Sequence, residues 1–277
     1  MQKFFWPAVI AAVVSIVVLQ FAQPQGQTGS KAETVYERVL RTGVINCGYV
    51  VWNPLVIRDP NTGQFSGMTY EIVEALAREI GVKVNWVEET GWGAYGVGLQ
   101  TNRFDLMCQT LWQSGQHTRA ALLTTPVSRE VVLAWKRQSE KRFNSLAELN
   151  DPAVRIAVVE GDVTQKIRSL KFSAATEVAL ASNADVGQYY LTLNTNKADI
   201  MFAGPSTMHD YNKSNPTQGF VPVSETPVRV FNQVLGVKPD EHQFKAMLDS
   251  AIDALYSTGE LPAIIKKYHP GFIPLDK

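Results

Sequence analysis

The sequence predicts an α/β protein built from two related lobes. The chain has 277 residues, of which 45% are apolar, enough for a packed α/β core. Residues 44–89 follow a strand, helix, strand pattern, which favours a parallel sheet. The segment LQTNRFDLM at 99–107 recurs as LNTNKADIM at 193–201, so the same local structure is expected once in each lobe.

The elements of the first lobe follow from local patterns. VINCGYV at 44–50 is rich in β-forming residues, and the Asp-Pro and Asn-Thr-Gly signals that follow predict a short hairpin. MTYEIVEALAREI carries apolar residues at helical spacing, and Gly81 ends that helix. VKVNWVEE alternates apolar and polar residues, as a half-buried strand does.

The repeated segment predicts a helix, a tight turn and a buried strand. Asn102 and Asn196 suit the left-handed backbone of such a turn, and Asp105 opens the strand of the first copy. The second copy occupies the same place in its own strand and helix series, after the strand predicted at 155–159. Two amphipathic helices, at 240–267, are expected to close the chain.

Composition and termini limit the function. The formal net charge is zero and no basic run exists, so a nucleic-acid partner is excluded. Residues 4–22 form an apolar run after Lys3, predicted to be either a signal peptide (1–22) or an N-terminal membrane anchor. Residues 23–33 have the polar composition of a linker, and everything beyond is expected to be exported.

Cys47 and Cys108 are the only thiols. A bridge between them and two free buried thiols both remain open, although exported proteins often pair their cysteines. No spacing typical of metal ligands or of a catalytic nucleophile surrounds them, so no metal, cofactor or catalytic residue is predicted.

Several motifs, in order, resemble one family. They are GYVVWNP, GQFSGMTYEIVEALAREIG, GWGAYGVGLQTNRFDL, TTPVS, IAVVEGD and ALYSTGELPAIIKKYHPG. The chain resembles family 3 solute-binding proteins, the exported receptors of amino-acid ABC importers. The resemblance implies a periplasmic binding protein-like type II fold, with lobe 1 at 34–130 and 232–277 and lobe 2 at 131–231. Two crossing strands, near 128–132 and 228–233, would join the lobes beside a ligand cleft.

The resemblance also implies how a ligand would be held. The family places an arginine on the carboxylate of an amino acid, but that position is His117 here, with Arg119 two residues later as a replacement. The family's aspartate for the ammonium group falls on Ala203, Gly204 or Pro205. These departures argue against an ordinary α-amino acid.

Aromatic and acidic residues stand in the altered cleft. Trp52, Trp92 and Trp112, with Tyr49, could stack on a flat ligand or surround a cation, while packing inside a lobe is the alternative for Trp52 and Trp112. Asp162 could face a positive ligand or only cap a helix. The predicted ligand-binding residues are Tyr49, Trp52, Trp92, Thr110, Trp112, His117, Arg119, Glu160, Asp162 and Gly204.

The predicted function is that of a periplasmic, non-catalytic binding protein. It would deliver a small polar ligand, an amino acid or a related amine or cation, to an ABC transporter permease by closing its hinge. One alternative is an exported enzyme similar to cyclohexadienyl or prephenate dehydratases, although no second catalytic group accompanies His117 or Glu160. Another alternative is a membrane-tethered receptor domain.

Overall fold

A computed structural model describes residues 32–268 and 270–275 of the chain. Residues 1–33 and 34–277 form separate units, and only the second is described below. The predicted signal peptide or anchor, and nearly all of the predicted linker, lie outside the described residues. Within the described ranges, no helix combines the length and the apolar character needed to cross a bilayer.

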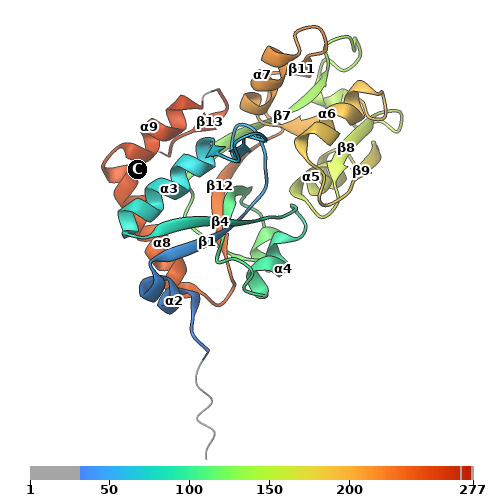
Figure 1. The fold of residues 1–277 in the computed structure, drawn as a ribbon. Helices are drawn as coiled ribbons and strands as arrows, with labels where there is room; N and C mark the ends of the chain where they lie inside the picture. Colours follow the sequence, from blue (N-terminus) through green and yellow to red (C-terminus); the bar gives the residue numbers. More distant parts are fainter. Residues whose placement is uncertain (1–31, 269, 276–277) are drawn as a thin grey trace, which may run out of the picture. The chain divides into compact units, whose positions relative to one another are not determined.

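One sheet runs through both lobes, in the order β10-β7-β12-β5-β1-β4, with β6 beside β12 and with β11 and β13 beside β7. In Figure 1 it continues from β1 and β4 toward β7 and the helices of lobe 2. Its strands are β1 (Val44–Tyr49), β4 (Lys83–Glu89), β5 (Leu106–Trp112), β6 (Leu122–Leu123), β7 (Ser128–Arg137), β10 (Met201–Ala203), β11 (Phe220–Pro222), β12 (Arg229–Val237) and β13 (Phe272–Ile273).

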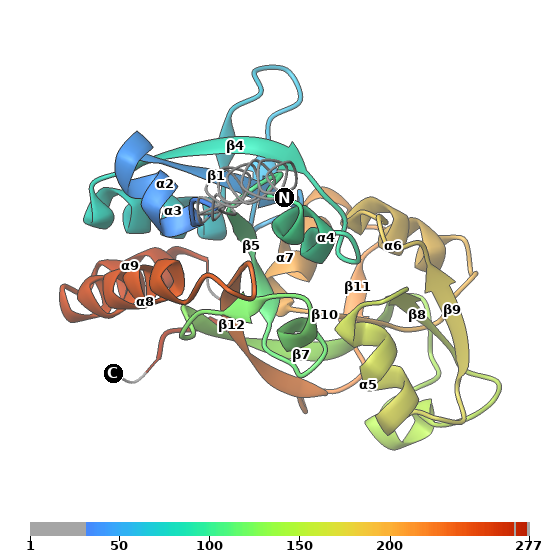
Figure 2. The same ribbon diagram turned by 90° about the horizontal axis from the view of Figure 1, so that it is seen from below.

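Lobe 1 packs helices on both faces of this sheet. Strand alternation directs Leu106 and Cys108 of β5 into one apolar cluster, and Met107 and Leu111 into another. Figure 2 shows α3, α8 and α9 on one side of β5 and α4 on the other. The helices are α2 (Val35–Thr42), α3 (Met68–Ile80), α4 (Tyr95–Gln100), α8 (His242–Ser257) and α9 (Glu260–Lys267).

The local predictions for lobe 1 are confirmed. The helix predicted in MTYEIVEALAREI is α3, and Gly81 ends it in the left-handed conformation, with φ of 82°. The predicted hairpin is the antiparallel pair β2 (Ile57–Arg58) and β3 (Phe65–Ser66). The β1–β4 pair is parallel, as the strand, helix, strand pattern indicated.

Lobe 2 repeats the arrangement around a second parallel pair, β8 (Arg155–Val159) and β9 (Thr176–Leu180). Ile156 and Val158 of β8 pack with α5 residues, while Ala157 and Val159 pack with residues of α6 and α7. The helices are α5 (Val163–Lys171), α6 (Val186–Asn194) and α7 (Pro205–Ser214). Two short 3-10 helices, η1 (His117–Arg119) and η2 (Leu146–Leu149), complete the described elements.

Strands β7 and β12 connect the two lobes. They pair antiparallel, with Ser128 opposite Gln233 and Val132 opposite Arg229, in the segments predicted to cross. Beyond this segment, β7 pairs with β10 and β11 in lobe 2, and β12 pairs with β5 and β6 in lobe 1. The predicted lobe boundaries fall inside these continuous strands and stay a prediction.

The repeated segment forms the same joint twice. Asn102 and Asn196 both adopt the left-handed conformation, with φ of 55° and 57°. Three residues later, the backbone N–H groups of Asp105 and Asp199 donate to a carbonyl of β1 and of β8, at 2.9 and 2.8 Å. The prediction that one structural step recurs in both lobes is therefore confirmed.

Cys47 of β1 and Cys108 of β5 form a disulfide, with their Cα atoms 5.3 Å apart. This decides the alternative that the sequence left open. The bridge joins neighbouring strands beneath the helices of lobe 1, and both cysteines are fully buried.

Candidate functional site

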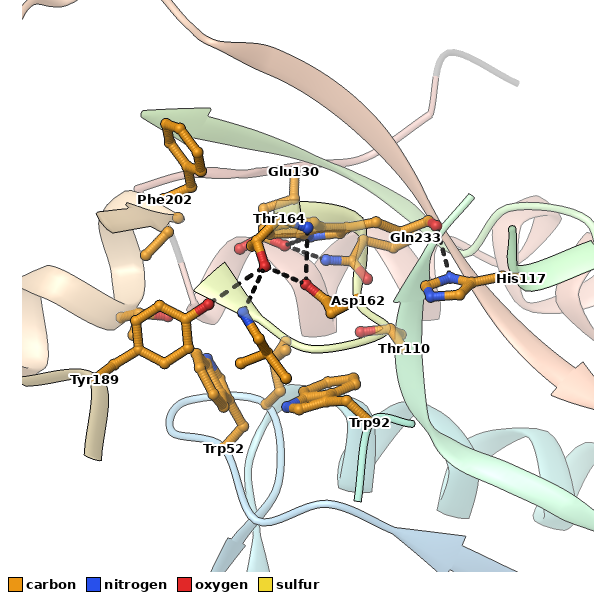
Figure 3. A pocket seen from close by; sticks show the side chains of 16 residues that line it. Trp52, Trp92, Thr110, His117, Glu130, Asp162, Thr164, Tyr189, Phe202 and Gln233 are labelled. Atoms are coloured by element: carbon orange, nitrogen blue, oxygen red, sulfur yellow. Dashed lines mark hydrogen bonds between the residues drawn. The ribbon is translucent and has the colours of Figure 1, made fainter. Parts of the chain in front are cut away.

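A pocket lies between the lobes, against the strands that connect them. It has a cavity volume of about 60 Å³, which corresponds to roughly four to six water molecules. Figure 3 shows side chains from both lobes pointing into it. The lining residues are Trp52, Leu55, Trp92, Thr110, Trp112, His117, Glu130, Val159, Asp162, Thr164, Tyr189, Phe202, Ala203, Gly204, Thr207 and Gln233.

Glu130 of β7 is the deeply buried carboxyl group of the pocket. The Glu130 residue is 4% exposed to solvent. Its Oε2 accepts hydrogen bonds from Trp112 Nε1, at 2.6 Å, and from Gln233 Nε2. Burial raises the pKa of Glu130 to about 7, although both hydrogen bonds favour the ionised form.

Two acceptor atoms, one of Glu130 itself and one of Gln233, have no hydrogen-bond donor among the described residues. Within the described part of the chain, Glu130 Oε1 accepts no hydrogen bond, and Gln233 Oε1 is buried without one. The Gln233 amide turns its NH₂ toward Glu130 because a carboxylate only accepts, so its oxygen faces elsewhere. Glu130 Oε1 lies over Gly204, where any Cβ would overlap it.

Trp112 builds the wall next to this carboxylate. Its ring stacks on Phe231 of β12, with centroids 4.8 Å apart and planes 5° apart, and its indole N–H is used by Glu130. Trp112 therefore lines the pocket and also packs against the lobe-2 core, and its contact with a ligand stays a prediction.

Asp162 and Thr164 contribute the polar part of lobe 2. Asp162 caps α5, because its Oδ1 accepts from Thr164 N at 2.9 Å and from Thr164 Oγ1 at 2.8 Å. Thr164 Oγ1 also accepts from the Tyr189 hydroxyl at 3.3 Å. Asp162 is thus a helix cap that also lines the pocket, and its role in facing a positive ligand stays a prediction.

An aromatic wall joins the lobes on the other side of the pocket. Trp52 meets Trp92 edge to face at 5.7 Å, and it meets Tyr189 of lobe 2 in the same manner at 6.0 Å. Edge-to-face pairs turn the electron-rich face of one ring toward the edge of the next. Aromatic faces attract the positive end of a ligand.

His117 is buried in the wall of the pocket. Its residue is 4% exposed, and its ring meets Tyr95 edge to face at 5.8 Å. Its Nδ1 lies 3.0 Å from the Trp112 carbonyl, which only accepts, so the neutral ring keeps Nε2 as an acceptor. Burial lowers the pKa of His117, although the Asp162 charge and the Trp112 carbonyl oppose this.

The lobes touch at the pocket rim, away from the connecting strands. Gln116 Nε2 donates to the Gly161 carbonyl, and the Gly93 N–H donates to the Ser182 carbonyl at 3.4 Å. A Cβ at Gly93 would lie 2.7 Å from the Ser182 Cβ, so only glycine allows this approach. The conformation described is therefore a closed one.

Most of the predicted binding residues come together here. Trp52, Trp92, Thr110, Trp112, His117, Asp162 and Gly204 line the pocket. Thr110 is buried, with its hydroxyl 3.4 Å from that of Thr69 at the start of α3.

Tyr49, Arg119 and Glu160 do not reach the pocket. Tyr49 packs under the β2–β3 hairpin, edge to face with Phe65 at 4.9 Å, because strand alternation turns it away. Arg119 is exposed after the η1 turn and lines a separate groove. Glu160 is exposed in the turn before α5, where Asp162 takes the inward position.

Sequence reasoning missed Glu130, Gln233, Thr164 and Tyr189. A signal existed for the first two, since the apolar strands SREVVLAW and FNQVLGV carry inward polar residues, Ser128 and Glu130 in the first and Gln233 in the second. Burying a carboxylate costs free energy, so an acid in a predicted crossing strand indicates a functional role. No comparable signal marked Tyr189. In the described residues, no cluster of three or more His, Cys, Asp or Glu side chains is arranged to hold a metal.

Comparisons with known proteins agree with this two-lobed, cleft-binding architecture. Residues 45–271 match the model of the bacterial extracellular solute-binding proteins, family 3. The chain belongs to this family.

Individual relatives are distant. The chain is 26% identical over 123 residues to a probable amino-acid ABC transporter-binding protein of Haemophilus influenzae (strain ATCC 51907 / DSM 11121 / KW20 / Rd), covering 44% of this chain and 47% of that protein. It is 23% identical over 96 residues to the L-cystine-binding protein TcyA of Bacillus subtilis (strain 168), covering 34% and 35%. The matches thus span about half or less of these relatives.

Solved structures share the fold at low identity. One is an ancestral amino acid-binding protein described as a precursor of cyclohexadienyl dehydratase. It is 18% identical, with a TM-score of 0.73, and the match covers 86% of this chain and all (100%) of that one. At this identity the likeness shows the fold alone.

Proposed function

We propose that this protein binds a small organic cation in the pocket and delivers it, outside the cytoplasm, to an ABC importer in the membrane. The charge of the pocket carries this proposal. Its lining includes the carboxyl groups of Glu130 and Asp162, three tryptophans, and no lysine or arginine among the described residues. Acidic groups and aromatic faces are the surfaces that hold a cation in a desolvated site.

The same lining opposes an ordinary α-amino acid. A bound carboxylate needs an arginine or comparable donors, and two carboxyl groups in the same small cavity would repel it. Arg119 was the replacement suggested by the sequence, but it is exposed and lines another groove. The pocket therefore favours an amine or another organic cation over the amino acids bound by relatives.

Hinge closure would carry the signal to the transporter. Strands β7 and β12 are continuous through both lobes, and the rim contacts of Gly93 and Gln116 exist only when the lobes meet. A ligand that contacts both lobes stabilises the closed form by its differential affinity, and a permease can read that form. The compartment, periplasmic or anchored to a membrane, stays a prediction.

Absence of catalysis is part of the same proposal. A prephenate-like substrate carries two carboxylates, and nothing cationic in the lining balances them. His117 already contacts the Trp112 carbonyl through Nδ1, and burial lowers its pKa, which disfavours a protonated, acid-donating ring. Turnover of such a substrate would contradict the proposal.

The test uses pairs of ligands that differ only in a carboxylate. Thermal unfolding of the purified protein is measured with alanine and ethylamine, with arginine and agmatine, and with prephenate. A ligand at a hundred times its Kd adds ~2.7 kcal/mol, so Tm would rise by roughly 5–10 °C. We expect a rise with an amine and none with its amino acid. A rise with the amino acid alone would overturn the choice of ligand class.

Closure is tested at the rim. Gly93→Ala places a Cβ against Ser182, so it should weaken amine binding about tenfold or more, because the closed form becomes rarer. Gly115→Ala is the matched control, since a Cβ there meets nothing within 4 Å. Equal affinities of the two variants would argue against closure as part of binding.

A further inference from the structure

The buried carboxyl group of Glu130 is costly, and no cation among the described residues compensates its charge. Its two hydrogen-bond donors, Trp112 Nε1 and Gln233 Nε2, are neutral, and both serve Oε2. No lysine, arginine or protonated partner forms an ion pair with it in the described residues. The free-energy cost of burying a carboxylate is offset only by a nearby cation or by a full set of hydrogen-bond donors.

The unused atoms point to what is missing. Glu130 Oε1 and Gln233 Oε1 are both acceptors, and both lack a donor within the described residues. Gln233 is fully buried, and both side chains line the pocket. Acceptors of buried residues almost always have a partner, and Gln233 Oε1 is enclosed by protein, so a bound group with N–H donors would complete Glu130 Oε1.

Gly204 makes room for the Glu130 carboxyl group at the pocket. It precedes α7, and any side chain there would overlap Glu130 Oε1. The absence of a side chain therefore lets the lobe-2 backbone approach this oxygen closely. The group that fills the remaining space must be small, in keeping with a cavity of about 60 Å³.

We infer that Glu130 Oε1 accepts an N–H hydrogen bond from the ammonium group of the ligand, so that the connecting strand β7 selects primary and secondary ammonium ions over quaternary ones. This inference rests on the proposed function, since it assigns the atom that holds the cation. Aromatic faces alone do not make this distinction, because a quaternary ammonium group also binds them. Glu130 belongs to a strand that joins the lobes, so the ligand's nitrogen would sit at the hinge while Asp162 and Trp52 enclose it.

The experiment compares one cation with and without N–H donors. Binding of ethylammonium, ethyldimethylammonium and ethyltrimethylammonium is measured by calorimetric titration at pH 8 with the wild-type protein and with Glu130→Gln. Wild type should prefer ethylammonium to ethyltrimethylammonium by about 10- to 100-fold, the effect of a hydrogen bond to a charged group. In Glu130→Gln this preference should shrink by a similar factor, whereas any purely steric part would remain.

Controls separate the alternatives. Glu71→Gln is the matched variant, since Glu71 accepts from Lys267 and Tyr268 on lobe 1 outside the pocket, and its preference should equal that of wild type. Gly204→Ala tests the same hydrogen bond in a second way. Its Cβ displaces Glu130 Oε1, so it should weaken ethylammonium binding without changing the charge of the pocket. Circular dichroism checks that each variant is folded.

The outcomes distinguish two failures. If wild type and Glu130→Gln show the same preference for ethylammonium, the assignment of Glu130 is wrong while cation binding stands. If wild type binds none of the three ions, nor any amine of the earlier panel, the proposed function fails and this inference falls with it.

Discussion

Asp199, beside the start of β8 in lobe 2, and Glu130, in the connecting strand β7, are both buried acids, but their surroundings differ. Asp199 is fully buried and accepts from Arg155 through the backbone N–H, Nε and Nη2 at 2.9–3.0 Å, and from Arg142 at 3.0 Å. Burial acts to raise its pKa, but the arginine contacts hold that pKa below its ordinary value. Glu130 has only neutral donors, and burial raises its pKa to about 7. The difference separates an acid that stabilises the fold from one that the fold merely tolerates.

The contrast also assigns roles. A carboxylate surrounded by cations of its own chain is satisfied before any ligand arrives. A carboxylate left without a cation in a closed pocket is one that a cationic ligand can complete. Substitutions at the two sites should therefore have opposite effects on stability.

Asp199→Asn should cause the largest loss. It leaves Arg155 and Arg142 without a buried anion, and we expect the free energy of unfolding to fall by about 3 kcal/mol, measured by urea denaturation at pH 7. Asp240→Asn is the control, because Asp240 is 73% exposed and its contact with Lys238 is 4.0 Å, so the change should stay within about 0.5 kcal/mol. A loss below 1 kcal/mol at Asp199 would remove the distinction drawn above.

Glu130→Gln should act in the other direction. Between about pH 4.5 and 7 the folded protein binds a proton at Glu130 that the unfolded chain releases, so this group lowers the stability of the ligand-free protein as pH rises. The difference corresponds to about 3 kcal/mol at pH 8. The variant should therefore be more stable than wild type at pH 8 and nearly equal at pH 5, by thermal or urea unfolding. A less stable variant at pH 8 would mean that Glu130 is structural.

Asp199 also shows what a sequence can predict. Like Asp105, it belongs to the repeated motif, and such local patterns predicted the helices, the hairpin and the equivalence of the two joints. The crossing strands and the pocket residues Trp52, Trp92 and Trp112 followed from the resemblance to the family.

What failed depended on the direction of single side chains. Tyr49 ends β1 next to the cleft, but the register of β1 against β4 directs its ring under the hairpin. Arg119 and His117 are two residues apart, and only the η1 turn decides which one is buried. Glu130 and Gln233 meet because β7 and β12 pair in one register, which no local pattern reveals.

The affinity for a cation should depend on pH in a way that Asp199 cannot imitate. Binding requires the ionised form of Glu130, so the Kd of ethylammonium should rise up to tenfold for each pH unit below about 7. His117 and Asp162 also line the pocket, and a histidine that becomes charged at low pH would weaken binding in any variant. The difference between wild type and Glu130→Gln, measured from pH 5 to 8, isolates Glu130. Parallel pH profiles would contradict its role.

The smallest expected effect tests whether the structural joints are truly equivalent. Asn102 and Asn196 hold left-handed turns with nearly equal φ, and alanine tolerates that conformation less well than asparagine does. Asn102→Ala and Asn196→Ala should each lower the free energy of unfolding by about 1 kcal/mol, while glycine at either position should be neutral or slightly stabilising. Neither change should alter the Kd of ethylammonium, because neither residue lines the pocket. Unequal losses of unfolding free energy would show that the two lobes share the motif but not its contribution to stability. A change in the Kd of ethylammonium in one variant would mean that this turn also sets the position of the strand that leads to the pocket.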